Sequence, residues 1–131
     1  MSEFINTAEV LGDEAVVTKI IDRTITEYKE NRVTSIGQAA LSYCQSLTTV
    51  DLPNVTSIGT TAFVGCSALT TVILRSETVC TAVNANILNN TPIKSGTGYV
   101  YVPDDLVDSY KAATNWSTYA NQIKPISELG E

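Results

Sequence analysis

Apolar and polar residues recur in one order through the middle of the chain, from Val33 to Arg75. The run Val-Thr-Ser-Ile-Gly that begins at Val33 begins again at Val55, which lies 22 positions later. The run Leu-Thr-Thr-Val-x-Leu begins at Leu47 and returns at Leu69, with the same spacing. A period of this length is typical of a solenoid, in which each unit buries its apolar side only against its neighbours.

Within the leucine-containing run, apolar and polar residues alternate as in a half-buried strand. We expect Val50 and Leu52 to point into the core, and Thr49 and Asp51 to point outward. Extending the register in both directions adds a strand at Ile25–Lys29 and a last strand at Tyr99–Val102. Strands that follow one another in a single register predict a parallel sheet of about four strands.

The segments between these strands contain a glycine, an apolar plug and a cysteine. Gly37 and Gly59 are predicted to adopt a positive φ or a tight bend. Leu41 and Phe63 are predicted to plug a short helical turn in each unit. Three cysteines are expected to be buried small apolar residues, with an adventitious disulfide as the alternative: Cys44, Cys66 and Cys80.

Both ends of the chain are predicted to be helical. Asp13 can cap a helix that runs to about Asp22, and its apolar stripe consists of Val16, Val17, Ile20 and Ile21. Asp104 is predicted to cap a helix to about Ala113, and a second short helix carries Trp116, Tyr119, Ala120 and Ile123. The expected division is an N-terminal segment with a capping helix (1–22), a repeat domain (23–103) and a C-terminal helical cap (104–131).

The repeated pattern resembles the BspA-like leucine-rich repeats. The resemblance rests on Thr-Ser-Ile-Gly, Ala-Leu or Ala-Phe, a cysteine and Leu-Thr-Thr-Val-x-Leu between 33 and 76. It extends to Asp22–Glu27, to residues 77–129, and to Tyr99–Pro103 with the following Asp104–Tyr110, which is similar to the family's C-terminal cap. The chain departs from the family in having Leu41 where phenylalanine is usual and in having few repeats. The resemblance implies an α/β fold: a short leucine-rich-repeat solenoid with an N-terminal helix and a C-terminal helical cap.

The charged and catalytic residue types exclude several functions. The chain has a formal net charge of −6 and eight scattered Lys and Arg residues, so no basic stripe is available for nucleic acid or an anionic membrane. It has no His, which excludes Ser-His-Asp and Cys-His catalysis and leaves no complete zinc site. No apolar run approaches the roughly 20 residues of a membrane span. We expect a non-enzymatic protein without a cofactor or a metal.

The outer face of the predicted sheet is the candidate binding surface. Its side chains form two columns and a rim residue: Glu27, Thr49, Thr71 and Tyr99; Lys29, Asp51, Ile73 and Tyr101; and Arg75. Paired tyrosines offer amphipathic area for protein or sugar. The alternative is an ordinary strand surface, because Thr and Tyr also stabilise their cross-strand neighbours.

Two functions are compatible with these features. The first is a phage virion component, a tail-associated or capsid decoration protein for host or surface attachment, because BspA-like repeats occur in adhesins and in proteins encoded near phage tail genes. The N-terminus of the chain lacks the charged region and the long apolar region of a signal peptide, as expected of a virion protein assembled in the host cytoplasm. An apolar segment would attach it to a larger assembly as a homo-oligomer: Phe4, Ile5, Val10 and Leu11. The alternative is a bacterial surface adhesion or protein-interaction module, part of a longer protein, that binds a cell-surface protein or glycan.

Overall fold

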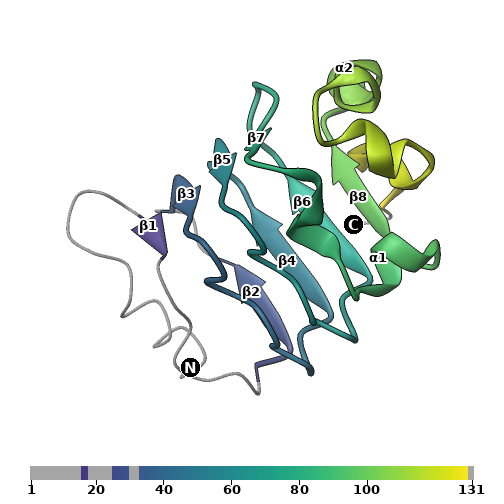
Figure 1. The fold of residues 1–131 in the computed structure, drawn as a ribbon. Helices are drawn as coiled ribbons and strands as arrows, with labels where there is room; N and C mark the ends of the chain where they lie inside the picture. Colours follow the sequence, from purple (N-terminus) through teal and green to yellow (C-terminus); the bar gives the residue numbers. More distant parts are fainter. Residues whose placement is uncertain (1–15, 18–24, 30–32, 130–131) are drawn as a thin grey trace.

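A computed structural model describes residues 16–17, 25–29 and 33–129 of the chain. Within this part, the chain winds through repeated coils whose strands form two parallel sheets (Figure 1). The long sheet contains β2 (Glu27–Lys29), β4 (Thr49–Leu52), β6 (Thr71–Leu74), β8 (Tyr99–Val102) and β9 (Ile123–Pro125). The short sheet contains β1 (Val16–Val17), β3 (Ser35–Ile36), β5 (Ser57–Ile58) and β7 (Thr81–Ala82). The predicted solenoid is therefore confirmed.

From β2 to β6 the register of the long sheet keeps the 22-residue spacing, and the step from β6 to β8 is 28 residues. Tyr28 is opposite Val50, Val50 is opposite Val72, and Val72 is opposite Val100. All of these pairs are parallel, as expected for strands joined by crossover connections. Successive coils therefore stack equivalent residues directly on one another.

The short sheet was not predicted. Its strands come from the Val-Thr-Ser-Ile-Gly runs, which the sequence analysis assigned to the connection between strands. Ser35 is opposite Ser57 and Ile36 is opposite Ile58, and the two serine Oγ atoms lie 3.0 Å apart. Each coil therefore contributes one strand to each sheet, with the core between them.

The core is a set of stacked apolar columns. Its largest side chains that are almost completely buried are Trp116, Tyr28, Tyr110, Tyr119, Phe63, Ile36, Leu41, Leu47, Leu52, Ile58 and Leu69. Leu41 and Phe63 occupy equivalent turns, as predicted. Cys44, Cys66 and Cys80 are buried and form no disulfide within the described residues, so their predicted packing role is confirmed.

Gly37 and Gly59 begin tight turns, one of the two predicted alternatives: the N–H of Ala40 donates to the Gly37 carbonyl at 3.2 Å and that of Ala62 to the Gly59 carbonyl at 3.3 Å. The other alternative, a positive φ, does not occur at either glycine. Non-glycine residues hold these turns instead: Ala39, Tyr43 and Thr61 have φ values of 57°, 59° and 56°. Gly59 serves close packing, because a Cβ atom there would lie 2.7 Å from the backbone nitrogen of Gln38 in the preceding coil.

The helix predicted from Asp13 to Asp22 is wrong at Val16–Val17. These residues form β1 and pair with Ser35 and Ile36 of β3. Both are β-branched, which favours a strand over a helix. The rest of the predicted helix lies outside the described residues, as does the proposed assembly segment of Phe4, Ile5, Val10 and Leu11.

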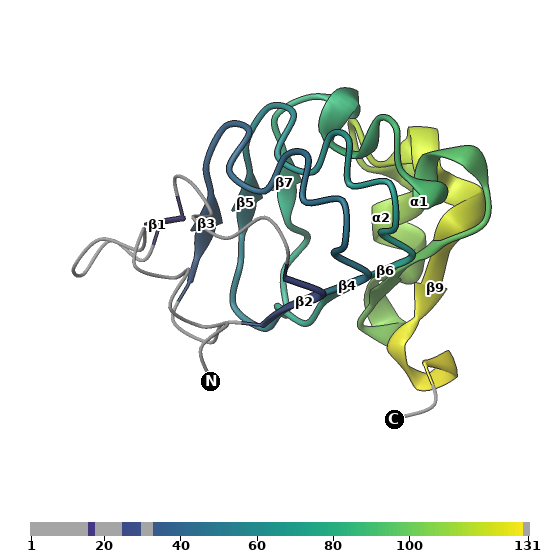
Figure 2. The same ribbon diagram turned by 90° about the horizontal axis from the view of Figure 1, so that it is seen from below.

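Helical segments close the C-terminal end of the solenoid, as Figure 2 shows. They are η3 (Ala85–Leu88), α1 (Pro92–Ser95), η4 (Asp104–Leu106), α2 (Val107–Ala112), η5 (Ser117–Gln122) and η6 (Ile126–Glu128), where η denotes a 3₁₀ helix. Tyr110, Trp116 and Tyr119 from this region belong to the main core. In the part of the chain that the structure describes, no helix has the length and apolar character needed to cross a membrane.

Two details of the predicted cap are wrong. Asp104 does not cap the helix: Pro103 precedes η4 without a side-chain hydrogen bond, and the Oδ1 atom of Asp104 accepts one from the backbone N–H of Ser127 instead. Ile123 is not helical but begins β9, a fifth long-sheet strand in the described structure that pairs in parallel with β8.

Candidate binding face on the long sheet

The two predicted columns of side chains form on the outer face of the long sheet. Register pairs join Glu27 to Thr49, Thr49 to Thr71 and Thr71 to Tyr99. The second column runs through Lys29, Asp51, Ile73 and Tyr101, and β9 extends it to Lys124. Lys124 was not predicted to lie on this face, because the spacing of the adjoining Ile123 favoured a helix.

Two of the predicted face residues are not accessible. Asp51 is 5% exposed and Ile73 is 4% exposed. Ile73 is buried but does not belong to the main core cluster. A partner on this surface would therefore meet the ends of the columns, Glu27 and Lys29 at β2 and Tyr99 and Tyr101 at β8, more than their centre.

Asp51 is buried with a cation beside it. The guanidinium of Arg75 donates two hydrogen bonds to its carboxylate, from Nε to Oδ1 at 2.9 Å and from Nη2 to Oδ2 at 3.1 Å. This paired geometry matches the planar fork of arginine to both carboxylate oxygens. The predicted rim residue Arg75 thus connects the end of β6 to β4, which is a structural role.

The face threonines Thr49 and Thr71, and the threonines that precede them, also have structural partners. The Thr48 hydroxyl donates to the Thr26 carbonyl at 3.1 Å, and the Thr70 hydroxyl donates to the Thr48 carbonyl at 3.5 Å. The hydroxyl oxygens of Thr49 and Thr71 lie 3.5 Å from those of Thr48 and Thr70. These contacts repeat from coil to coil and support the stacking, so the threonines alone do not indicate a ligand.

An accessible aromatic group lies at the β8–β9 end of the face. The ring centroids of Tyr99 and Tyr101 are 6.2 Å apart, and the rings are tilted by 59°. The Lys124 ammonium lies 5.5 Å from the Tyr99 centroid, within the range of a cation–π contact. Tyr99 is 36% exposed. We call Tyr99, Tyr101 and Lys124 the aromatic patch.

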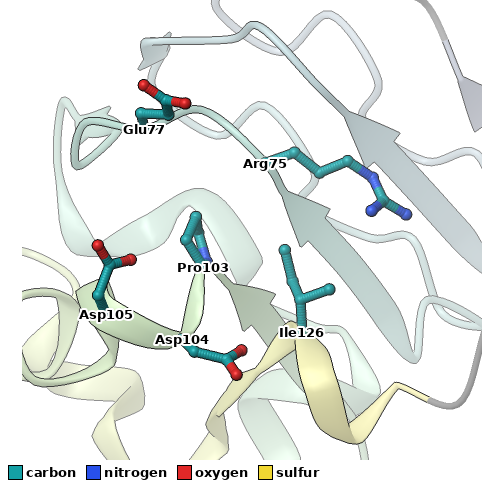
Figure 3. A pocket seen from close by; sticks show the side chains of 6 residues that line it. All are labelled: Arg75, Glu77, Pro103, Asp104, Asp105 and Ile126. Atoms are coloured by element: carbon teal, nitrogen blue, oxygen red, sulfur yellow. The ribbon is translucent and has the colours of Figure 1, made fainter.

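Two hollows lie beside this face, at the carboxyl ends of the long-sheet strands. The larger has a volume of about 720 Å³ and is lined by Arg75, Glu77, Pro103, Asp104, Asp105 and Ile126 (Figure 3). The smaller, of about 580 Å³, is lined by Thr34, Pro53, Asn54, Thr56, Arg75, Ser76, Glu77 and Thr78. Of these residues, the sequence analysis singled out only Arg75 for the binding surface.

Hydrogen bonds from Ser127, first from its side chain and then from its backbone N–H, lower the pKa of Asp104 below its ordinary value of 3.8, and this carboxylate is ionised at neutral pH. Among the described residues, no group of His, Cys, Asp or Glu could hold a metal ion. The sequence and these surfaces fit recognition of a partner through side-chain contacts.

The family comparison agrees with this geometry. Residues 20–104, more than half of the chain, match the family described as the BspA type leucine rich repeat region (6 copies). The chain belongs to the BspA-type leucine-rich repeat family. None of the curated proteins compared with this BspA-type chain matches it.

The family places the chain among protein-binding and adhesion modules. Leucine-rich repeat domains generally mediate protein–protein interaction, and their family is typically non-enzymatic. For this BspA-type chain, the question is therefore which part of its surface a partner contacts.

Proposed function

We propose that this BspA-type chain is a non-enzymatic binding module that docks a protein partner on the exposed part of its long-sheet face. The aromatic patch is the centre of the contact, and Glu27, Lys29, Thr49 and Thr71 extend it. The observation that carries this proposal is the Tyr99–Tyr101 pair, whose ring centroids are 6.2 Å apart on β8, next to the edge strand β9, with Tyr99 exposed.

Physical properties of the patch support this role. Tyrosine buries a large amphipathic area with few rotatable bonds, so it is enriched where interface binding energy is concentrated. The strands that carry the tyrosines are held in a regular ladder, so little ordering accompanies binding. Lys124 adds a positive charge that lies over a ring instead of in an ion pair with a described residue.

The first experiment measures binding of the labelled full chain to intact bacterial cells and to a glycan array. We expect Tyr99→Ala with Tyr101→Ala to abolish cell binding. Tyr43→Ala is the matched control, because Tyr43 is 57% exposed and belongs to a turn instead of the long sheet. If protease treatment of the cells abolishes binding of the chain, the partner is a protein. Binding of the chain to the glycan array favours the glycan alternative. Binding that survives the double substitution would remove the aromatic patch from consideration.

We further propose that the module works on a phage virion, as a tail-associated or capsid decoration subunit. The resemblance to repeats encoded near phage tail genes supports this setting, with Phe4, Ile5, Val10 and Leu11 as the attachment segment and a homo-oligomer as the expected form. The alternative setting is a bacterial surface, where the chain would be the adhesion part of a longer protein.

The setting is tested separately from the binding face. Light scattering during size-exclusion chromatography should give an oligomeric mass for the full chain, and Phe4→Asp with Val10→Asp should reduce it to the monomer. Tyr99→Ala with Tyr101→Ala should leave the mass unchanged. A monomer in every case would count against the assembled subunit, whereas tail or capsid genes beside this one would support it.

A further inference from the structure

The two hollows adjoin, because Arg75 and Glu77 line both of them. Together they form a groove along the segments that follow β2, β4, β6, β8 and β9. Neighbouring strands lie about 4.8 Å apart, so the groove crosses roughly 19 Å of the sheet, the length of about six extended residues. Its shape therefore suits a short extended chain better than a compact small molecule.

The groove has an uncompensated negative charge. Its carboxylates are Glu77, Asp104 and Asp105, and its one cationic lining side chain is Arg75. The Arg75 guanidinium donates to Asp51, and Figure 3 shows it turned away from Glu77 and Asp105. Within the described residues, neither Glu77 nor Asp105 forms an ion pair.

The remaining lining residues provide contacts for a polypeptide. Pro53, Pro103 and Ile126 offer apolar surface, and Thr34, Thr56 and Thr78 line the smaller hollow. The carboxylates are not grouped closely enough to hold a metal ion, within the part of the chain that the structure describes. The ligand that meets both the charge and the length of the groove is a basic peptide segment.

We propose that this groove binds an extended segment of a partner protein that carries lysine or arginine. The basic side chains pair with Glu77 and Asp105, and the peptide backbone runs past the threonine hydroxyls. The formal net charge of −6 attracts such a segment from a distance. This site is separate from the aromatic patch, so the module has two independent contact surfaces.

Fluorescence anisotropy with the full chain tests the proposal. The probe is a labelled peptide of alternating lysine and glycine, and a peptide of alternating glutamate and glycine is its matched control. We expect the lysine peptide to bind at about 0.05 M salt and to weaken strongly at about 0.5 M salt, where exposed charges are screened. The glutamate peptide should not bind. Absence of binding by the lysine peptide would overturn the proposal.

Charge-matched variants separate the groove from diffuse attraction. Glu77→Gln with Asp105→Asn should raise the dissociation constant about fivefold to tenfold, since each exposed pair contributes a modest free energy. Asp108→Asn with Glu128→Gln removes the same charge at exposed positions outside the lining. This control should change the dissociation constant less than about twofold. Equal weakening by both pairs would show that net charge, and not the groove, attracts the peptide.

Backbone amide shifts in nuclear magnetic resonance spectra locate the peptide. The largest shifts should fall on Thr56, Ser76, Glu77 and Asp105. Tyr99→Ala with Tyr101→Ala should leave the affinity unchanged, which distinguishes this groove from the proposed binding face. Shifts confined to Tyr99 and Tyr101 would overturn the groove and assign the peptide to that face.

Discussion

The backbone N–H of Cys80 donates a hydrogen bond of 2.7 Å to the hydroxyl of Tyr110. The indole Nε1–H of Trp116 donates to the carbonyl of the same Cys80 at 2.6 Å, and the amide of Asn115 donates to the Ala82 carbonyl at 2.8 Å. β7 is the last strand of the short sheet, and its other edge bonds to β5. Side chains of the C-terminal cap therefore take the place of the next strand, so β7 does not have to end in unsatisfied backbone groups.

Replacing Tyr110 with phenylalanine removes only the acceptor in this arrangement. Cys80 is fully buried, so its N–H would lose its partner without gaining water. We expect Tyr110→Phe to lower the free energy of unfolding by about 1–3 kcal/mol. Urea denaturation followed by circular dichroism measures this. Tyr43→Phe is the matched control and should have no effect, because Tyr43 is exposed; equal stability of the two variants would contradict the role assigned to Tyr110.

Burial of Cys80 and Tyr110 predicts a loss of stability in alkaline solution. Burial raises the pKa of Cys80 from 9.0 to about 12, and burial is also the main cause that raises the pKa of Tyr110 from 10.0 to about 12. Both groups are neutral in the folded chain, so their contribution is complete below the unfolded-state pKa values and is lost as pH rises toward about 12. Stability should therefore begin to fall near pH 9.

Unfolding in urea with a reductant, at several pH values between neutral and about 11, checks this expectation. Cys80→Ala should make this loss of stability smaller, because the Cys80 thiol no longer titrates. A pH dependence identical to that of the original chain would show that Cys80 does not contribute.

The Arg75–Asp51 ion pair should contribute to the free energy of unfolding. The Asp51 side chain is 7% exposed and that of Arg75 is 28% exposed, so the pair is partly screened by solvent. Arg75→Ala leaves the buried Asp51 carboxylate without this partner. It should lower the free energy of unfolding by about 1–3 kcal/mol. A double-mutant cycle with Asp51→Ala and Arg75→Ala should give a coupling energy of about 1–2 kcal/mol, measured by thermal or urea unfolding. Additive losses would show that the two residues act independently.

The repeated pattern was sufficient to predict β2, β4, β6 and β8 and their register, because each of these strands carries its own alternation of inward and outward residues. Alternation gives the direction of a side chain but not its exposure. Asp51 and Ile73 lie on the predicted outer face, yet both are buried, and for Asp51 the cause is its pairing with Arg75 of the adjoining strand end. Such contacts depend on residues 24 positions apart and leave no local pattern.

The short sheet and β9 were missed for a related reason. Ser35–Ile36 and Ser57–Ile58 are too short for alternation to be recognised, and they are strands because the coils stack. Ile123 continues the helical spacing of Trp116, Tyr119 and Ala120, but its partner is Val100 of β8. At Ile123, pairing with a distant strand outweighs the local helical periodicity. For this reason Lys124, one of the three residues of the aromatic patch, was not predicted.

Neighbouring coils approach each other closely at Gly59. A Cβ atom there would lie 2.7 Å from Gln38 N and 2.8 Å from the Gly37 carbonyl carbon, and backbone atoms cannot move aside as a flexible side chain can. Gly59→Ala should therefore push neighbouring coils apart. It should lower the free energy of unfolding by about 1–3 kcal/mol, as overpacking usually does. The backbone N–H of Gly59, which donates to the Ile36 carbonyl at 2.7 Å, should exchange its hydrogen faster in a variant that separates the coils. Urea unfolding measures the free energy, with the exposed Gln45→Ala as the control that should change little. Unchanged stability of Gly59→Ala would mean that the coils stack less tightly at this point than the close approach requires.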